Sequence, residues 1–280
     1  MLFQKEIYKY KSMSNNTFNG RRFLLLWKQH FTQNTKLLIL SSVVYVGVVF
    51  LVLTIAQIGR QLIPNGKDVF QGLALVFFFI FGILYVGHAF SSFRSKESTI
   101  SYLMVPASVL EKFLFEFISR IAIIVLALPL LYWAAFNLQG YFFSVFTGYV
   151  FEPIGWGALI EVVVTVDGAT GDLKPAVYTF VSLLTFLALV VPFTGATIFN
   201  KQPLVKTLFS LVLIFLFYFG YAYIAVVHLG LKDMRPPKDM WLFPFDSEGA
   251  TPLWWLNSML IITHAVMFFV GYRKLKEKEV

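Results

Sequence analysis

The sequence contains no cysteine among its 280 residues. This absence excludes disulfide bonds, thiolate metal sites, thiol nucleophiles and iron–sulfur clusters held by this chain. Histidine, the other frequent metal ligand, is also scarce. His30, His88, His228 and His264 lie on four different segments, and none is spaced from a carboxylate as metal ligands are. The sequence therefore predicts no metal site and no bound cofactor.

Charged residues are few. They make up 14% of the chain, against about 25% in an ordinary soluble domain, while 58% of the residues are hydrophobic and the mean hydropathy is +0.73. A soluble protein of this composition would expose large apolar patches. The net charge is +8, but the basic residues flank apolar runs and do not form a polar domain. We therefore expect membrane lipids, and not nucleic acid, as partners.

Six apolar runs contain no Asp, Glu, Lys or Arg at all. One such residue at a helix centre costs roughly 2.5–3.5 kcal/mol on membrane insertion, and about 20 apolar residues cross a bilayer core. We therefore predict an all-α integral membrane protein with six transmembrane helices, the third of which starts in a polar segment before its apolar run. The predicted membrane helices are residues 37–58, 69–90, 108–138, 176–199, 207–228 and 253–272.

The basic residues predict the orientation of these helices. With six crossings, 17 of the 23 Lys and Arg residues fall on one side of the membrane, including those of the segment 1–36 and of the tail. The positive-inside rule places that side, and with it both termini, in the cytoplasm. Trp241, Trp254 and Trp255 then lie at the outer interface, where aromatic belts occur.

Residues 20–34 have the pattern of a helix that lies on the membrane surface. Phe23, Leu24, Trp27 and Phe31 repeat at helical spacing, and Arg21, Arg22, Lys28 and Gln29 occupy the rest of the wheel. We predict an amphipathic interfacial helix. The alternative is that this segment is a simple extension of the first membrane helix.

The loop from Ser91 to Arg120 has more local structure than a simple connector needs. A short helical element ends before Pro106, because the residue before a proline disfavours helix. Ser108 and Glu111 then match the Ser-x-x-Glu capping box, which predicts the start of an amphipathic helix that feeds the third span. Its apolar face includes Phe113 and Phe117. Its other face carries Glu111, Lys112, Glu116 and Arg120.

Two further features leave alternatives open. The outer loop 139–175 is too long for a turn, and its strand-like residues 159–167 favour a small folded cap or an interfacial hairpin, while a re-entrant segment at 141–160 is the alternative. His264 lies inside the last span, where an ionisable residue is a candidate for function. The simpler interpretation is a neutral imidazole that is hydrogen-bonded to a neighbouring helix.

The sequence shows no motif through which this chain could itself drive transport with ATP or an ion gradient. A Gly-x-x-x-x-Gly-Lys-Ser/Thr phosphate-binding loop is absent. The predicted spans also lack the Asp and Glu residues on which proton- and sodium-coupled transporters rely. These absences argue against ATP binding through such a loop and against ion-coupled transport.

In architecture, and in the residues of the loop after the second span, the chain resembles the ABC-2 type permease family of bacterial exporters. The loop contains Tyr102-Leu103, Pro106 and Ser108, followed by Glu111-Lys112-Phe113, which is similar to the Tyr-Leu-x-x-Pro-x-Ser core and Glu-Lys-Phe continuation of that family. One difference is that the longest outer loop here follows span three, whereas the family often has extra outer helices between spans five and six.

The resemblance implies a single permease domain over residues 1–280, in the bacterial inner membrane, with no catalytic residue of its own. It implies a cytoplasmic ATPase partner, a second permease subunit (identical or related), and export of a lipid-like, glycan or amphipathic substrate. By position, 97–105 would be the coupling helix and 20–34 the connecting helix. The residues implied at the ATPase contact are Glu97, Ser98, Thr99, Ile100, Tyr102, Leu103, Met104 and Pro106.

Two other functions remain alternatives. One is a membrane scaffold or assembly subunit that only binds partners. The other is a membrane-embedded enzyme acting on lipids, which the lack of clustered His, Asp and Glu near the interfaces makes less favourable.

Overall fold

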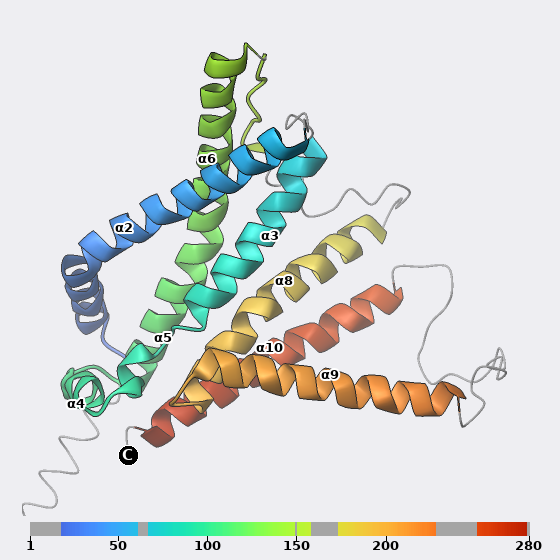
Figure 1. The fold of residues 1–280 in the computed structure, drawn as a ribbon. Coiled ribbons are helices and arrows are strands. Elements are labelled where there is room, and N and C mark those ends of the chain that lie inside the picture. The colour runs from blue at the N-terminus through green and yellow to red at the C-terminus, as the bar shows by residue number, and fades with distance from the viewer. Residues whose placement is uncertain (1–17, 61–66, 149, 158–172, 228–250, 279–280) are drawn as a thin grey trace, which may run out of the picture.

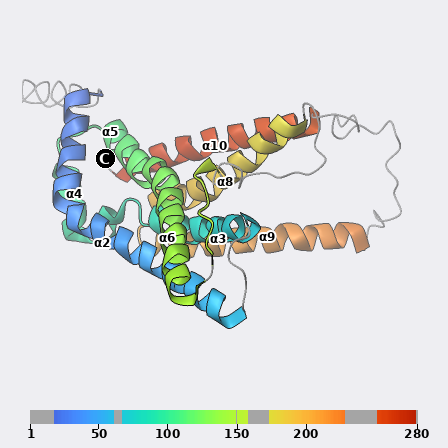
Figure 2. The ribbon, with the colours of Figure 1, turned by 90° about the horizontal axis from the view of Figure 1, so that it is seen from above.

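The computed structural model describes residues 18–60, 67–148, 150–157, 173–227 and 251–278, and the regular elements in these residues are all helices (Figures 1 and 2). The long helices are α2 (Gly20–Arg60), α3 (Lys67–Val86), α6 (Ile123–Thr147), α8 (Leu173–Ile198), α9 (Pro203–Val227) and α10 (Thr251–Lys278). The short ones are η1 (Ser91–Arg94), α4 (Lys96–Met104), α5 (Val109–Phe117) and a π-helical turn, Ile118–Ala122.

The helices have the length and composition of membrane spans. Four stretches are long and apolar enough to cross a bilayer: Gly20–Ile58, Val109–Thr147, Pro175–Ile198 and Leu253–Lys278. The prediction of an all-α protein with several membrane-spanning helices is therefore confirmed for these four stretches. The remaining predicted spans, 69–90 and 207–228, correspond to α3 and α9, whose described apolar parts are the shorter Phe70–Val86 and Pro203–Phe217.

The predicted interfacial helix and the first span form one continuous helix, α2. Its first turns lie at an angle to the rest (Figures 1 and 2). Three polar residues near the bend donate side-chain hydrogen bonds to carbonyls one turn earlier: Thr32 to Lys28, Asn34 to His30 and Thr35 to Phe31. Such bonds bend a helix. The sequence pattern therefore marked a change of direction within one helix, and not a boundary between two.

The helix that contains the predicted third span continues past the predicted end of that span. Helix α5 starts after Ser108, passes through the π-helical turn without a break, and continues as α6 to Thr147. The helix thus continues nine residues beyond residue 138, where the span is predicted to end. Gln139 is buried and its amide donates to the Gln57 side-chain oxygen on α2 at 2.5 Å, so a polar residue continues the helix. Gly148, with φ of 68°, caps it.

Aromatic side chains fill the centre of the bundle. Phe70 of α3 packs on Tyr132 and Phe136 of α6, and the Tyr132 hydroxyl donates to the Phe70 carbonyl at 3.0 Å. Phe113 and Phe117 of α5 pack on Phe193 of α8. Helix α8 also runs beside α10, while the far end of α9 lies away from both (Figures 1 and 2).

Part of the predicted outer cap is described. Residues 150–157 return along α6, where the Trp133 indole and the Asn137 amide donate to the Ile154 carbonyl at 2.7 and 3.3 Å. The Ile154 amide donates to the Asn137 side-chain oxygen in return. The predicted strand-like residues 159–167 lie outside the described residues.

Several segments meet at one end of the bundle, which we call the basic end and define as residues 18–36, 91–112 and 273–278. Figure 1 shows the start of α2, helix α4, the start of α5 and the C-terminal end of α10 gathered there. The last turn of α10 reaches η1, because Lys278 Nζ lies 5.1 Å from the ring centroid of Phe93. The last turn of α10 and the loop after α3 are thus packed together.

Candidate functional site

Helix α4 covers almost the whole segment that the sequence predicts as a short cytoplasmic helix. Ser95 caps its start, since its hydroxyl accepts from the Ser98 amide at 3.3 Å. The hydroxyls of Ser98 and Thr99 donate to the Ser92 carbonyl of η1 at 2.7 and 3.1 Å. The exposed Glu97 lies in the first turn, where a negative charge favours the helix dipole. The start of α4 is therefore bonded to η1.

Helix α4 directs its apolar side chains outward. Ile100, Leu103 and Met104 are 51%, 40% and 78% exposed. Tyr102, on the other side, packs against the Phe93 ring at 5.1 Å, and the Lys112 ammonium lies 5.0 Å from its centroid. One face of α4 thus holds it to η1 and α5, and the other presents apolar atoms.

The connection from α4 to α5 is short and capped. Val105 is extended and ends α4 before Pro106. Both hydrogen bonds of the predicted capping box are present: the Glu111 amide donates to the Ser108 hydroxyl at 3.2 Å, and the Ser108 amide donates to Glu111 Oε2 at 2.8 Å. The start of α5 is fixed by its own side chains.

The polar face of α5 is buried, contrary to what an amphipathic pattern suggests for a surface helix. Glu111, Lys112 and Glu116 are 0%, 3% and 7% exposed. The carboxylate of Glu111 accepts from the Asn19 amide at 2.6 Å and from the Arg22 guanidinium at 3.0 Å. The first turns of α2 therefore cover this face.

The contact between α2 and α5 combines aromatic rings and ion pairs. The rings of Trp27 and His30 lie 5.2 and 5.1 Å from that of Phe115, both nearly edge-on. Arg120, in the π-helical turn, donates to Glu116 at 3.3 Å and lies 4.9 Å from the Tyr85 ring centroid. This contact joins α2 and α5 to α3.

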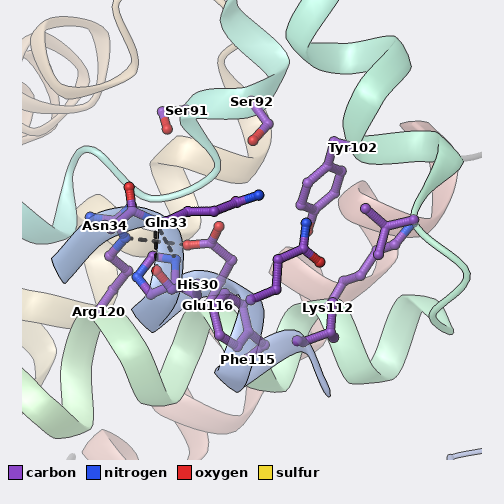
Figure 3. Close-up of a pocket in the computed structure, with 13 residues that line it drawn as sticks. His30, Gln33, Asn34, Ser91, Ser92, Tyr102, Lys112, Phe115, Glu116 and Arg120 are labelled. Carbon is purple, nitrogen blue, oxygen red and sulfur yellow. Dashed lines mark hydrogen bonds and ion pairs between the residues drawn. The ribbon is translucent and has the colours of Figure 1, made fainter. Parts of the chain in front are cut away.

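A cavity of about 290 Å³ remains between α2, η1, α4 and α5. In Figure 3, Ser91 and Ser92 lie across it from Phe115 and Glu116, and Tyr102 closes one side. Its lining consists of Leu26, Gln29, His30, Gln33, Asn34, Ser91, Ser92, Tyr102, Val105, Lys112, Phe115, Glu116 and Arg120. These groups can hold a polar ligand through hydrogen bonds and charge.

The structure brings only some of the predicted site residues together. Of the predicted contact residues on α4, Tyr102 lines the cavity, whereas Ile100, Leu103 and Met104 are exposed. The cavity could not be predicted from the sequence, because its lining combines residues 26–34 with residues between 91 and 120. The only signal in the sequence was the unusual number of polar residues on α5.

Metal ligands do not cluster in the described part of the chain, where no three His, Cys, Asp or Glu side chains are grouped as a metal site requires. His264 is buried on α10. Its Nδ1 bonds the Leu260 carbonyl of the same helix at 2.6 Å, and its ring stacks on Phe186 of α8 at 5.2 Å. His264 therefore contacts the neighbouring helix α8 by ring stacking. Its hydrogen bond lies within α10, and not to another helix as predicted.

Known proteins add no further constraint on this site. No protein-family model, no curated protein and no solved structure matches this chain.

Proposed function

We propose that the chain is the membrane-spanning permease subunit of an ATP-binding-cassette exporter. It crosses the bacterial inner membrane six times, with both termini in the cytoplasm, and moves a lipid-like, glycan or amphipathic substrate. A separate ATPase subunit hydrolyses ATP, and a second permease subunit completes the pathway.

The observation that carries this proposal is α4, a capped nine-residue helix with an exposed apolar face. Such a face is characteristic of a helix that fits into a groove of a partner. Ile100, Leu103 and Met104 provide it, and at the basic end a cytoplasmic subunit could cover it.

The contacts of α4 suit the transmission of movement into the membrane. Its start is bonded to η1 through Ser92, and Tyr102 packs against both Phe93 and Lys112. Beyond the capped turn, α5 continues into α6 as one 39-residue helical stretch, Val109–Thr147. A displacement of α4 would therefore move a membrane helix, which is the kind of coupling that an ATPase in a separate subunit requires.

The test is copurification from cells that also express the candidate ATPase. We expect an ATP-binding-cassette subunit to copurify with the unmodified chain. Ile100→Asp and Met104→Asp should reduce its recovery at least tenfold, because each places a charge in the apolar contact. The matched control is Ser101→Asp, an exposed position on the same helix, which should retain the partner.

Two results would contradict the proposal. One is the repeated absence of any ATPase subunit from purifications of the unmodified chain, which would favour the scaffold alternative. The other is equal recovery of the partner with Met104→Asp and with the unmodified chain.

A further inference from the structure

One of the hydrogen bonds at the bend of α2 requires a neutral histidine. The side-chain nitrogen of Asn34 lies 3.0 Å from the His30 carbonyl oxygen and 3.2 Å from His30 Nδ1. A carbonyl oxygen can only accept, so the Asn34 atom that contacts it is the amide nitrogen, which donates to both groups. His30 Nδ1 must then be an acceptor, and it carries no proton in this arrangement.

His30 also lies in the contact between α2 and α5. Its ring packs edge-on against the Phe115 ring at 5.1 Å, and the Trp27 ring contacts the same Phe115 ring at 5.2 Å. The His30 side chain is half-buried and lines the cavity of about 290 Å³. A change in the charge of this ring would therefore act on the packing of α2 against α5 and on the cavity.

The charged groups around the cavity do not favour a second charge on His30. Glu116 is the carboxylate among the described lining residues, and it already accepts from Arg120 at 3.3 Å (Figure 3). The other charged lining residue is Lys112, a cation that packs over the Tyr102 ring. From η1 and α4 the lining receives neutral side chains. A protonated His30 would thus add a cation beside the Arg120 guanidinium.

His30 precedes the predicted span 37–58 and lies in the interfacial turns of α2. Burial and the nearby Arg120 guanidinium lower the pKa of His30 below its ordinary value of 6.5. A ring released from this contact returns to the ordinary pKa of about 6.5. The released form therefore binds more protons in acid, so the contact is at full strength above about pH 6.5 and weakens as the pH falls below it.

We propose that His30 makes the contact between α2 and α5 sensitive to pH. At neutral pH the uncharged ring accepts from Asn34 and packs on Phe115. Protonation places a hydrogen on Nδ1 against the Asn34 amide, so the turns 27–34 separate from Phe115 and the cavity opens. The ion pair between Arg22 and Glu111 keeps the start of α2 attached. This inference does not depend on the proposed transport function, because it concerns the packing of the folded chain.

The experiment measures how readily a cysteine in the cavity wall reacts in the full chain, held in a neutral detergent. The sequence has no cysteine, so Ser92→Cys, at a half-buried position of the lining, is the only thiol. Its labelling rate with a maleimide is divided by that of Ser101→Cys, at an exposed position, to remove the effect of pH on thiol reactivity. We expect this ratio to rise at least about threefold from about pH 7.5 to about pH 5.5, since opening linked to one proton can rise by up to about tenfold per pH unit.

Three further variants, each combined with both cysteines, test whether His30 is responsible. His30→Gln cannot take up a proton, so the ratio should change less than about 1.5-fold over the same range. His88→Gln is the matched control, because His88 is exposed and its Nδ1 bonds the Leu84 carbonyl of its own helix. It should leave the rise intact. Asn34→Asp offers the protonated ring a carboxylate, so the rise should be lost or reversed, and this variant tests the proposal if His30→Gln does not fold.

Three results would overturn the proposal. The first is a labelling ratio that does not change with pH while His30 is present. The second is a rise that persists in His30→Gln or is unchanged in Asn34→Asp. The third is loss of the rise in His88→Gln, which would assign the pH dependence to another histidine.

Discussion

At the basic end, the carboxylate of Glu111 connects the start of α2 with the cap of α5. Glu111 accepts hydrogen bonds from the backbone of Asn19 and of Ser108 and from the Arg22 side chain. It is fully buried, so water cannot replace these acceptors if the carboxylate is lost. The cap of α5 and the position of the α2 N-terminus therefore depend on the same two oxygens.

Glu111→Ala should consequently destabilise the protein by about 2–4 kcal/mol, because it removes the acceptor of two backbone donors and breaks the ion pair with Arg22. The measurement is thermal or denaturant unfolding in detergent. The control is Leu110→Ala, the adjacent residue, whose side chain is 39% exposed, and we expect it to cost about 1 kcal/mol or less. Equal losses of stability in the two variants would show that Glu111 does not hold the start of α2 to the cap of α5.

Helices α8 and α9 approach each other closely at Gly195 of α8 and Thr207 of α9. A Cβ atom on Gly195 would overlap the Thr207 side chain, which itself donates to the Pro203 carbonyl at 2.7 Å. Glycine at such a position lets two membrane helices approach closely. The contact lies where α9 begins, before the helix diverges (Figure 1).

Gly195→Ala should therefore destabilise the fold by about 1–3 kcal/mol, through the overlap between α8 and α9. Gly72→Ala on α3 is the control, since a Cβ there meets no atom within 4 Å. It should be neutral or stabilise the chain by up to about 1 kcal/mol. The measurement is unfolding in detergent, and a smaller effect at Gly195 than at Gly72 would contradict the expectation.

Features that depend on residues close together in the sequence could be predicted from it. The apolar runs predict the long helices, and Ser108 with Glu111 predicts the start of α5, because insertion energy and capping act within a few residues. The burial of Glu111 and Lys112 could not be predicted in this way. It depends on the first turns of α2, about 90 positions away, and on the bend that brings them there. The cavity depends on the same packing of α2 against α5, so it could not be predicted from the sequence either.

The absence of cysteine makes the topology of the whole molecule easy to test. Any introduced cysteine is the only thiol, so its labelling by an impermeant maleimide reports one position. With six crossings and both ends inside, Ser101→Cys should be labelled in sealed right-side-out vesicles only after permeabilisation. Gly155→Cys, on the exposed segment after α6, should be labelled without permeabilisation. The reverse pattern would invert the orientation.

The two shorter apolar helices, α3 and α9, determine whether the crossings number four, five or six. If α3 crosses the membrane, Arg21→Cys in the first turn of α2 and Ser101→Cys after α3 lie on the same side and label alike. If α9 crosses, Lys201→Cys and Lys276→Cys also label alike, because Lys201 precedes α9 and Lys276 lies in the last turn of α10. All four positions are exposed, so lack of labelling cannot be attributed to burial. Opposite labelling within either pair would remove that helix from the membrane, and with it the shared cytoplasmic face that the ATPase contact requires.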